Sequence, residues 1–205
     1  MRAPRQHAPD TTFHITTHGV DDRPIFLDDI DRQTFVNRVG HIKRRSGWTV
    51  YALCLMTTHY HLVVQLREAN LRAGMSIVNG AHARLFNKRH ERRGPVFEAR
   101  YDDTPIEDEA HLVAAIQYVA QNPVRAGMVE RPEDWRWSTY AQLIGLAPAW
   151  PCFDRAATLA VFGSVHDVPG TAVPGTHERS EAQGSSVETS TRPYPPSPSD
   201  GPITT

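Results

Sequence analysis

Apolar and polar positions alternate along the chain with two different periods, and the change of period predicts the order of its secondary structure. Runs rich in β-branched and aromatic residues indicate strands. Stretches in which apolar residues recur every three or four positions indicate helices. This reasoning predicts strands over residues 13–18, 48–55, 59–66 and 96–101, main helices over residues 28–45, 71–92 and 107–121, and short helices near residues 132–140 and 154–162.

The predicted order is β-α-β-β-α-β-α, which is the split β-α-β arrangement of ferredoxin-like folds. We therefore expect an α+β domain with an antiparallel sheet and with its helices packed on one face. The first helix should bury an apolar stripe that includes Ile30 and Phe35. The last main helix should end near Gln121, because Asn122 precedes a proline and is biased away from helical geometry.

Composition divides the chain into four segments. Residues 1–11 lack periodicity and are expected to form a flexible arm, whereas residues 12–145 carry the patterns of one folded domain. Residues 146–163 are expected to add a short helical extension. Residues 164–205 are rich in Pro, Ser, Gly and Thr and carry more acidic than basic side chains, so this tail is expected to be disordered.

Composition also argues against several classes of protein. No apolar run approaches the ~20 residues that a membrane span requires, and no apolar segment of the kind found in secretory signals follows the basic start. The two cysteines, Cys54 and Cys152, match no zinc or redox spacing, so no disulfide is expected. These features predict a soluble protein of the cytoplasm without a membrane partner.

Two histidines one residue apart, His59 and His61, lie in the third predicted strand. Residues i and i+2 of a strand project from the same face, so the two imidazoles should lie side by side and form half of a metal site. Tyr118 and Asn122 are four residues apart and should share a face of the last main helix. A divalent cation held by two imidazoles and an amide oxygen would leave positions open for a phosphate oxygen.

Each of these residues also has an ordinary structural interpretation. A His-x-His pair can simply be hydrogen-bonded, Tyr118 can be a packed aromatic residue, and Asn122 can cap the end of a helix. On spacing alone, these structural interpretations are favoured over a catalytic site. A zinc hydrolase that uses Cys54 or His14 as a further ligand beside the histidine pair is another hypothesis, although it lacks a general base.

Three ordered segments resemble one known family. Residues 59–61, His-Tyr-His at the start of an apolar strand, resemble the HUH motif (histidine, bulky apolar residue, histidine) of single-tyrosine transposases. Residues 118–127 resemble the nucleophile segment of the REP-associated branch of these transposases, and residues 137–140 resemble its downstream element. The resemblance covers residues 10–145, and the three motifs together are far more specific than any one of them.

This resemblance implies a catalytic domain over residues 12–145 that binds single-stranded or hairpin DNA of palindromic repeat elements. His59 and His61 would bind Mg²⁺ or Mn²⁺, with Asn122 as a third ligand. Tyr118 would attack the scissile phosphodiester, form a 5′-phosphotyrosine and free a 3′-OH, which is the chemistry of a single-tyrosine transposase. The branch also favours a monomer over a dimer and an association with the nucleoid in the cytoplasm.

A basic stretch between residues 84 and 100 is a candidate for DNA binding on the ground of charge. Its members that would contact phosphates are Arg84, Lys88, Arg92, Arg93 and Arg100. Two departures from the family pattern reduce positive charge nearby: His18 stands where relatives often have arginine, and Asp102-Asp103 occupy a place where a basic residue is usual. A domesticated protein that binds DNA hairpins without cutting them is therefore the alternative function.

Overall fold

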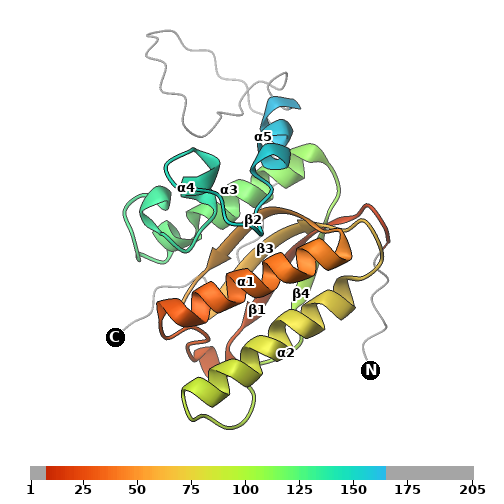
Figure 1. Cartoon of the computed structure of the whole chain (residues 1–205). Coiled ribbons are helices and arrows are strands. Elements are labelled where there is room, and N and C mark those ends of the chain that lie inside the picture. Colours follow the sequence, from red (N-terminus) through yellow and green to blue (C-terminus); the bar gives the residue numbers. More distant parts are fainter. Residues whose placement is uncertain (1–7, 165–205) are drawn as a thin grey trace.

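A computed structural model describes residues 8–164 of the chain (Figure 1). Most of the arm expected over residues 1–11, and almost all of the tail expected over residues 164–205, lie outside these described residues. The strands are β1 (Thr12–His18), β2 (Thr49–Leu55), β3 (His59–Gln65) and β4 (Asp102–Ile106). The helices are α1 (Asp29–Ser46), α2 (Leu71–Arg89), α3 (Glu109–Arg125), α4 (Tyr140–Leu143) and α5 (Arg155–Ser164), with short 3₁₀ helices η1 (Val20–Asp22) and η2 (Pro132–Asp134).

The four strands form one antiparallel sheet in the order β2-β3-β1-β4. Because β1 and β2 both run antiparallel to the intervening β3, they are parallel to each other, and α1 connects them in the split β-α-β arrangement. The ferredoxin-like α+β class expected from the sequence is confirmed. The register of β1 and β3 sets His18 opposite His59 and Thr16 opposite His61.

The helices cover both faces of the sheet, which corrects the expectation that they pack on one face. Alternate residues of the central strands, such as Ile15 and Leu62, point into a core shared with α1 and α2. Figure 1 shows these two helices side by side across the front of the sheet. On the opposite face, Val63 packs with Ile116 and Val119 of α3. This second face also carries apolar side chains, so it needs its own helical layer to exclude water.

The fourth strand begins after the segment that the pattern predicts. Residues 102–106 pair with β1, whereas residues 96–101 contribute only a short bridge, between Phe97 and Gly19. Both segments follow the same edge of β1, but only residues 102–106 pair with it continuously, whereas Phe97 meets the chain at Gly19, just after β1 ends. The polar sequence of β4 and its proline, Pro105, are tolerated because β4 lies at the edge of the sheet.

The last main helix continues to Arg125 and passes through Pro123, beyond the predicted end at Gln121. Asn122 and Pro123 are both buried. Packing of this final turn offsets the hydrogen bond that proline cannot donate. The side chain of Asn122 adds a bond of its own, since its Nδ2 donates to the backbone carbonyl of Tyr118 at 2.9 Å. Tertiary packing therefore overrides the local bias of a residue that precedes proline.

The predicted stripe of α1 is correct for Phe35 but wrong for Ile30, whose side chain is 60% exposed. At about 100° per residue, the five steps from Ile30 to Phe35 rotate Ile30 roughly 140° away from Phe35. Phe35 faces the sheet and is buried, so Ile30 must point toward solvent. The spacing of five, in place of three or four, is the reason why the stripe does not include Ile30.

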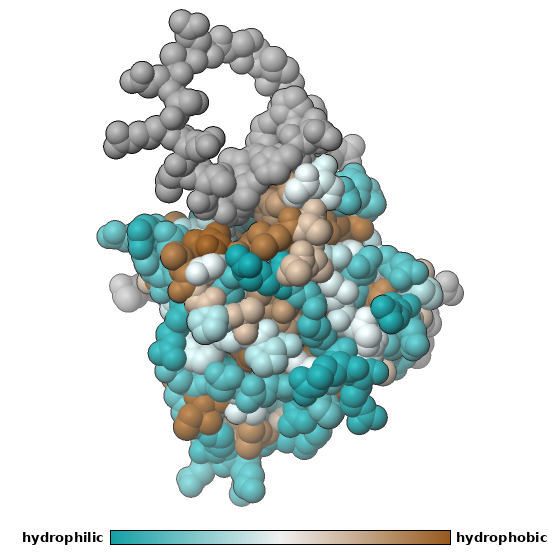
Figure 2. Space-filling model, turned by 45° about the horizontal axis from the view of Figure 1, so that its top comes forward, coloured by the Kyte–Doolittle hydropathy of each residue, from teal (hydrophilic) through white to brown (hydrophobic). Residues whose placement is uncertain are grey.

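Large apolar side chains that reach the surface come from different elements of the fold. Leu27 precedes α1, Ile77 belongs to α2 and Leu146 follows α4. In the view of Figure 2, hydrophilic residues cover most of the surface, and apolar residues gather in its upper part. No helix within residues 8–164 is both long enough and apolar enough to cross a membrane.

Candidate active site

The histidine pair on β3 points to the face covered by α3. Strand alternation directs Tyr60 and Leu62 toward α1 and α2, and it directs His59 and His61 toward the opposite layer. The imidazole centroids of the two histidines lie 5.0 Å apart with the ring planes nearly perpendicular. Both side chains are buried. The sequence prediction that the two rings are neighbours on one face therefore agrees with the geometry.

Two histidines of β1 join this pair and make a group of four that we call the histidine cluster, His14, His18, His59 and His61. His14 Nε2 lies 3.0 Å from His61 Nδ1, and Thr16 Oγ1 lies 3.4 Å from the same nitrogen. His18 stacks on His59 with ring centroids 4.9 Å apart. The cluster forms because residues two apart in β1 share a face, and β1 pairs with β3 in register.

His61 has no exposed surface. Burial lowers the pKa of His61 well below 6.5, and the other three members of the cluster lower it further. The interaction with the Asn122 side chain acts in the opposite direction and raises this pKa. The Nε2 of His61 makes no hydrogen bond of standard geometry with any residue in the described part of the chain. A neutral imidazole with a buried nitrogen of this kind is the form in which histidine binds a metal ion.

The helix α3 brings the other predicted residues to this face. The Tyr118 ring meets His61 and His14 edge-on, with ring centroids 5.7 and 5.8 Å apart. Asn122 is buried one turn later and interacts with His61. Its Nδ2 is already used by the Tyr118 carbonyl, which leaves Oδ1 as the atom that can face a cation. Tyr118, Asn122 and the histidine pair thus lie together within a single chain.

Arg125 also belongs to this site, although the sequence alone assigns it no role. Its guanidinium carbon lies 4.8 Å from the centroid of the Tyr118 ring, which is a cation–π distance. The sequence feature that could have placed Arg125 on the same side of the helix as Tyr118 is their spacing of seven residues, about two helical turns. The feature that could have placed His14 on the same face as His18 is their even spacing, with Thr16 between them, along one strand.

Tyr60 lies between the two histidines in sequence but belongs to the other face of the sheet. Its hydroxyl accepts a hydrogen bond from Thr17 at 2.9 Å and donates one to Asn79 of α2 at 2.7 Å. Burial raises the pKa of Tyr60. A fully buried hydroxyl with both hydrogen bonds made is unsuited to nucleophilic attack, so Tyr118 is the better candidate for that role.

The basic residues predicted to contact DNA fall into two groups. Arg84 and Lys88 are exposed on α2, the helix that covers the face opposite the histidine cluster. Arg92 follows α2 and is half-buried, with its guanidinium over the ring of Phe86 at 5.4 Å. The structure does not bring this group to the histidine cluster.

Arg93 and Arg100 form the second group, and both are exposed in the segment between α2 and β4. This segment pairs with the end of β1, where Phe97 bridges to Gly19 beside His18. The second group therefore lies at the same end of the sheet as the histidine cluster. None of the five predicted basic residues forms an ion pair with a residue in the described ranges.

A separate polar group, made of Asp28, Asp31 and His90, has ligand atoms close enough together to hold a metal ion. Arg89 donates hydrogen bonds to both carboxylates. These bonds lower the pKa of Asp28 to about 2, and Asp28 also caps α1 by accepting from the Asp31 N–H at 2.9 Å. Because a guanidinium already neutralises the carboxylates, this group serves to join the start of α1 to the end of α2.

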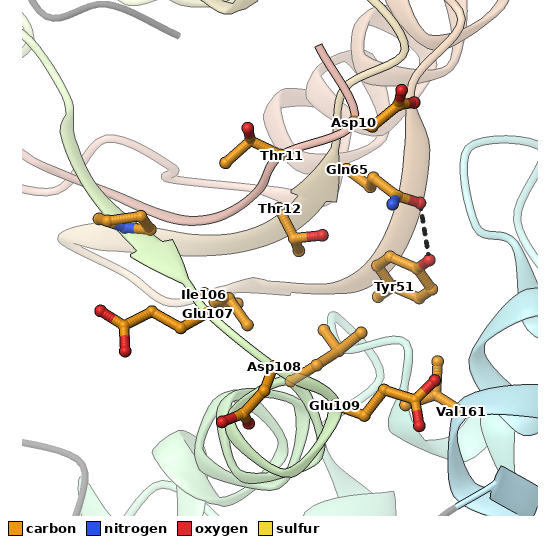
Figure 3. A pocket seen from close by; sticks show the side chains of 12 residues that line it. Asp10, Thr11, Thr12, Tyr51, Gln65, Ile106, Glu107, Asp108, Glu109 and Val161 are labelled. Atoms are coloured by element: carbon orange, nitrogen blue, oxygen red, sulfur yellow. Dashed lines mark hydrogen bonds between the residues drawn. The ribbon is translucent and has the colours of Figure 1, made fainter. Parts of the chain in front are cut away.

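An open cavity of about 580 Å³ lies at the other end of β1 from His18, beside the start of α3 (Figure 3). Figure 3 shows the carboxylates of Asp10, Asp108 and Glu109 around it, and Tyr51 donates a hydrogen bond to Gln65 in its wall at 2.9 Å. None of the predicted site residues lines this cavity. Its acidic lining is unsuited to DNA phosphates.

Comparison with known proteins identifies a family. A family model described as "Transposase IS200 like" matches residues 8–122. A protein of Haemophilus influenzae assigned as a REP-associated tyrosine transposase is 29% identical over 100 residues, and the match covers 43% of this chain and 57% of that relative. The chain therefore spans little more than half the length of the curated relative that it matches.

The fold also has a counterpart among solved structures, that of a REP-associated tyrosine transposase bound to a REP hairpin. The two superpose with a TM-score of 0.60 at 20% sequence identity, over 75% of this chain and 94% of the other. At this level of identity, the likeness establishes a shared fold. The sheet and its two helical layers are therefore a known architecture.

Proposed function

The chain belongs to the family of IS200-like transposases, and we propose that it cleaves and rejoins single-stranded or hairpin DNA through a 5′-phosphotyrosine intermediate. One observation carries this proposal: Tyr118 lies against His61 and one helical turn from the buried Asn122, all on one sheet face of one chain. The solved structure with the same fold holds a REP hairpin, which supports hairpin DNA as the substrate class.

His59, His61 and Asn122 fit a divalent metal ion. Two neutral imidazoles and an amide oxygen suit Mg²⁺ or, better, Mn²⁺, which accepts nitrogen ligands more readily. The buried Nε2 of His61 without a standard hydrogen bond is the structural observation that supports the fit. A bound ion would polarise the scissile phosphodiester and stabilise the negative charge of its transition state.

Tyr118 would act as the nucleophile in this reaction. Its phenolic oxygen loses a proton to solvent and attacks phosphorus, and the bond from phosphorus to the 3′ oxygen breaks. That oxygen takes up a proton and leaves as a free 3′-OH, while the 5′-phosphate stays on Tyr118. Attack by a 3′-OH on the phosphotyrosine restores the tyrosine and rejoins a strand. Arg125 stands over the Tyr118 ring, where its charge favours the phenolate.

The experiment for this proposal is the Tyr118→Phe variant. A pool of labelled hairpin oligonucleotides with randomised single-stranded flanks is incubated with Mn²⁺, and covalent adducts are separated on a denaturing gel. We expect Tyr118→Phe to remove the adduct completely while DNA binding stays within about twofold, because only the hydroxyl is lost. Tyr140→Phe is the matched control and should form the adduct. An adduct that persists in Tyr118→Phe would show that another residue is the nucleophile.

We propose Arg93 and Arg100 as the main residues that bind phosphates, with Arg84 and Lys88 contributing less. In Arg93→Gln/Arg100→Gln, the slope of log affinity against log salt should fall by about 0.7 for each phosphate of single-stranded DNA that the variant no longer neutralises. The matched pair Arg84→Gln/Lys88→Gln removes the same charge from α2 and should change the slope less. Equal slopes in both variants and in the wild type would refute these assignments.

A hairpin-binding protein without strand cleavage is the second candidate. It is favoured by the reduced positive charge near the site, since Asp102 pairs with Thr16 in the strand that carries His14 and His18. The same oligonucleotide pool separates the two functions. Specific binding without any adduct, in Mn²⁺ as well as Mg²⁺, would select the binding protein.

The structure gives no support to a zinc hydrolase. Burial raises the pKa of the Cys54 thiol to about 12, so the thiolate that zinc needs is unfavourable. His14 is hydrogen-bonded to His61 rather than placed beside it as a ligand. In the described part of the chain, no third His, Cys, Asp or Glu completes a metal-binding group with His59 and His61.

A further inference from the structure

Two buried histidines from neighbouring strands meet through their ring nitrogens. His14 Nε2 and His61 Nδ1 are 3.0 Å apart, and both side chains are buried. The rings are inclined by 22° with centroids 5.2 Å apart, so the two nitrogens lie on the facing edges of the rings. This is the geometry of an N–H···N hydrogen bond, in which one nitrogen donates and the other accepts.

A neutral pair can place the proton of this bond in two ways. If His61 Nδ1–H donates to His14 Nε2, the Nε2 of His61 keeps a lone pair. If His14 donates instead, the Nε2 of His61 carries a hydrogen and cannot bind a metal ion. The identity of the donor therefore decides whether His61 is a ligand.

The surroundings of the two His61 nitrogens favour the first arrangement. Around Nδ1 there are two potential acceptors, His14 Nε2 at 3.0 Å and Thr16 Oγ1 at 3.4 Å. Around Nε2, no hydrogen bond of standard geometry is made within the described chain, and the Asn122 side chain is the polar group that interacts with the His61 ring outside that geometry. A buried N–H is more stable where it finds an acceptor, so the hydrogen belongs on Nδ1.

We propose that His14 is a positioning residue: it accepts the Nδ1–H of His61, holds that ring in place and directs a lone pair on Nε2 toward the metal ion. This inference rests on the proposed function, because the ion is part of it. Partners of this kind typically contribute about 10- to 100-fold to metal affinity, since they fix both the tautomer and the orientation of the ligand.

The tautomer can be measured directly in the metal-free protein. Long-range ¹H–¹⁵N correlation spectra of the full chain with ¹⁵N-labelled histidine distinguish a protonated Nδ1 from a protonated Nε2. We expect His61 to be protonated at Nδ1 in the wild type and in His14→Gln, whose side-chain carbonyl can accept the same hydrogen bond. A wild-type His61 protonated at Nε2 would overturn the proposal.

Metal affinity is the second measurement, made without DNA by following free Mn²⁺ with electron paramagnetic resonance. We expect His14→Phe, which keeps a ring but no acceptor, to weaken Mn²⁺ binding about 10- to 100-fold, and His14→Gln to weaken it much less. His41→Phe is the control, because His41 is exposed on α1 and lies outside the histidine cluster, and it should leave Mn²⁺ binding unchanged. Unchanged affinity and an unchanged His61 tautomer in His14→Phe would refute the role.

The transposase chemistry and the role of His14 can fail separately, and the measurements distinguish the two failures. If the wild type forms no adduct on any hairpin, yet the tautomer and the Mn²⁺ affinity respond to His14 as expected, the transposase chemistry is wrong and the positioning role stands. If the adduct forms normally and His14→Phe changes neither the tautomer nor the affinity, the function stands and the positioning role is wrong.

Discussion

The two faces of the sheet use the same strands for different purposes. On the α1–α2 face, Ile15, Tyr60 and Leu62 pack into an apolar core, and the hydroxyl of Tyr60 has both of its hydrogen bonds. On the α3 face, the alternate positions carry the histidine cluster, and the Nε2 of His61 is buried without a standard hydrogen bond within the described residues. The two faces therefore differ in what the strands present to the helices: the polar tip of Tyr60 has its partners on one face, and a buried imidazole nitrogen that lacks a standard hydrogen bond lies on the other.

The two polar groups that could bind a metal show the same difference. The Asp28–Asp31–His90 group lies where α1 meets α2, and Arg89 neutralises its carboxylates. In the histidine cluster, His61 remains neutral because burial and the other histidines lower its pKa. Proximity of ligand atoms alone therefore does not mark a metal site, and the occupancy of each atom by protein partners must be considered.

The largest effect is expected for His61→Ala. This change removes a proposed metal ligand, so adduct formation should fall by more than about 100-fold, since residues that only orient a ligand already contribute about 10- to 100-fold. Far-ultraviolet circular dichroism should show that the fold is kept. Adduct yield within tenfold of the wild type would mean that the two faces do not differ in the way proposed.

The adjacent substitution, Leu62→Ala, should have the opposite profile. Leu62 is fully buried in the core with α1 and α2, and truncation of such a leucine lowers the free energy of unfolding by about 2–5 kcal/mol. Urea denaturation measures this loss. Under conditions where the variant is folded, its adduct yield should match that of the wild type, and a selective loss of adduct would contradict the separation of roles.

The smallest effect is expected for the pH dependence of stability in Asp28→Asn. The pKa of Asp28 is lowered to about 2 by Arg89, so its ionised form stabilises the fold above the ordinary pKa of 3.8. This contribution is lost as the pH falls from about 4 to about 2. Asparagine keeps the helix cap, so the variant should lose less stability than the wild type over this interval, as measured by urea midpoints. Parallel curves would show that the interaction with Arg89 is unimportant.

Most of the elements could be predicted from the sequence because they depend on local patterns. The α1 boundaries follow from the cap at Asp28 and the left-handed Gly47 that ends the helix. The start of β4 could not be predicted, since residues 96–101 are more strand-like than residues 102–106, and only the tertiary structure shows that the latter pair continuously with β1. The continuation of α3 through Pro123 likewise depends on packing that no local rule contains.

The sequence by itself determined which side chains share a face, His59 with His61 and Tyr118 with Asn122, because the backbone repeats every two residues in a strand and every 3.6 in a helix. Only the tertiary structure decided that α3 covers the histidine face and that His14 and Arg125 join the site. Those outcomes depend on which distant apolar surfaces must be buried together and on the register in which β1 pairs with β3.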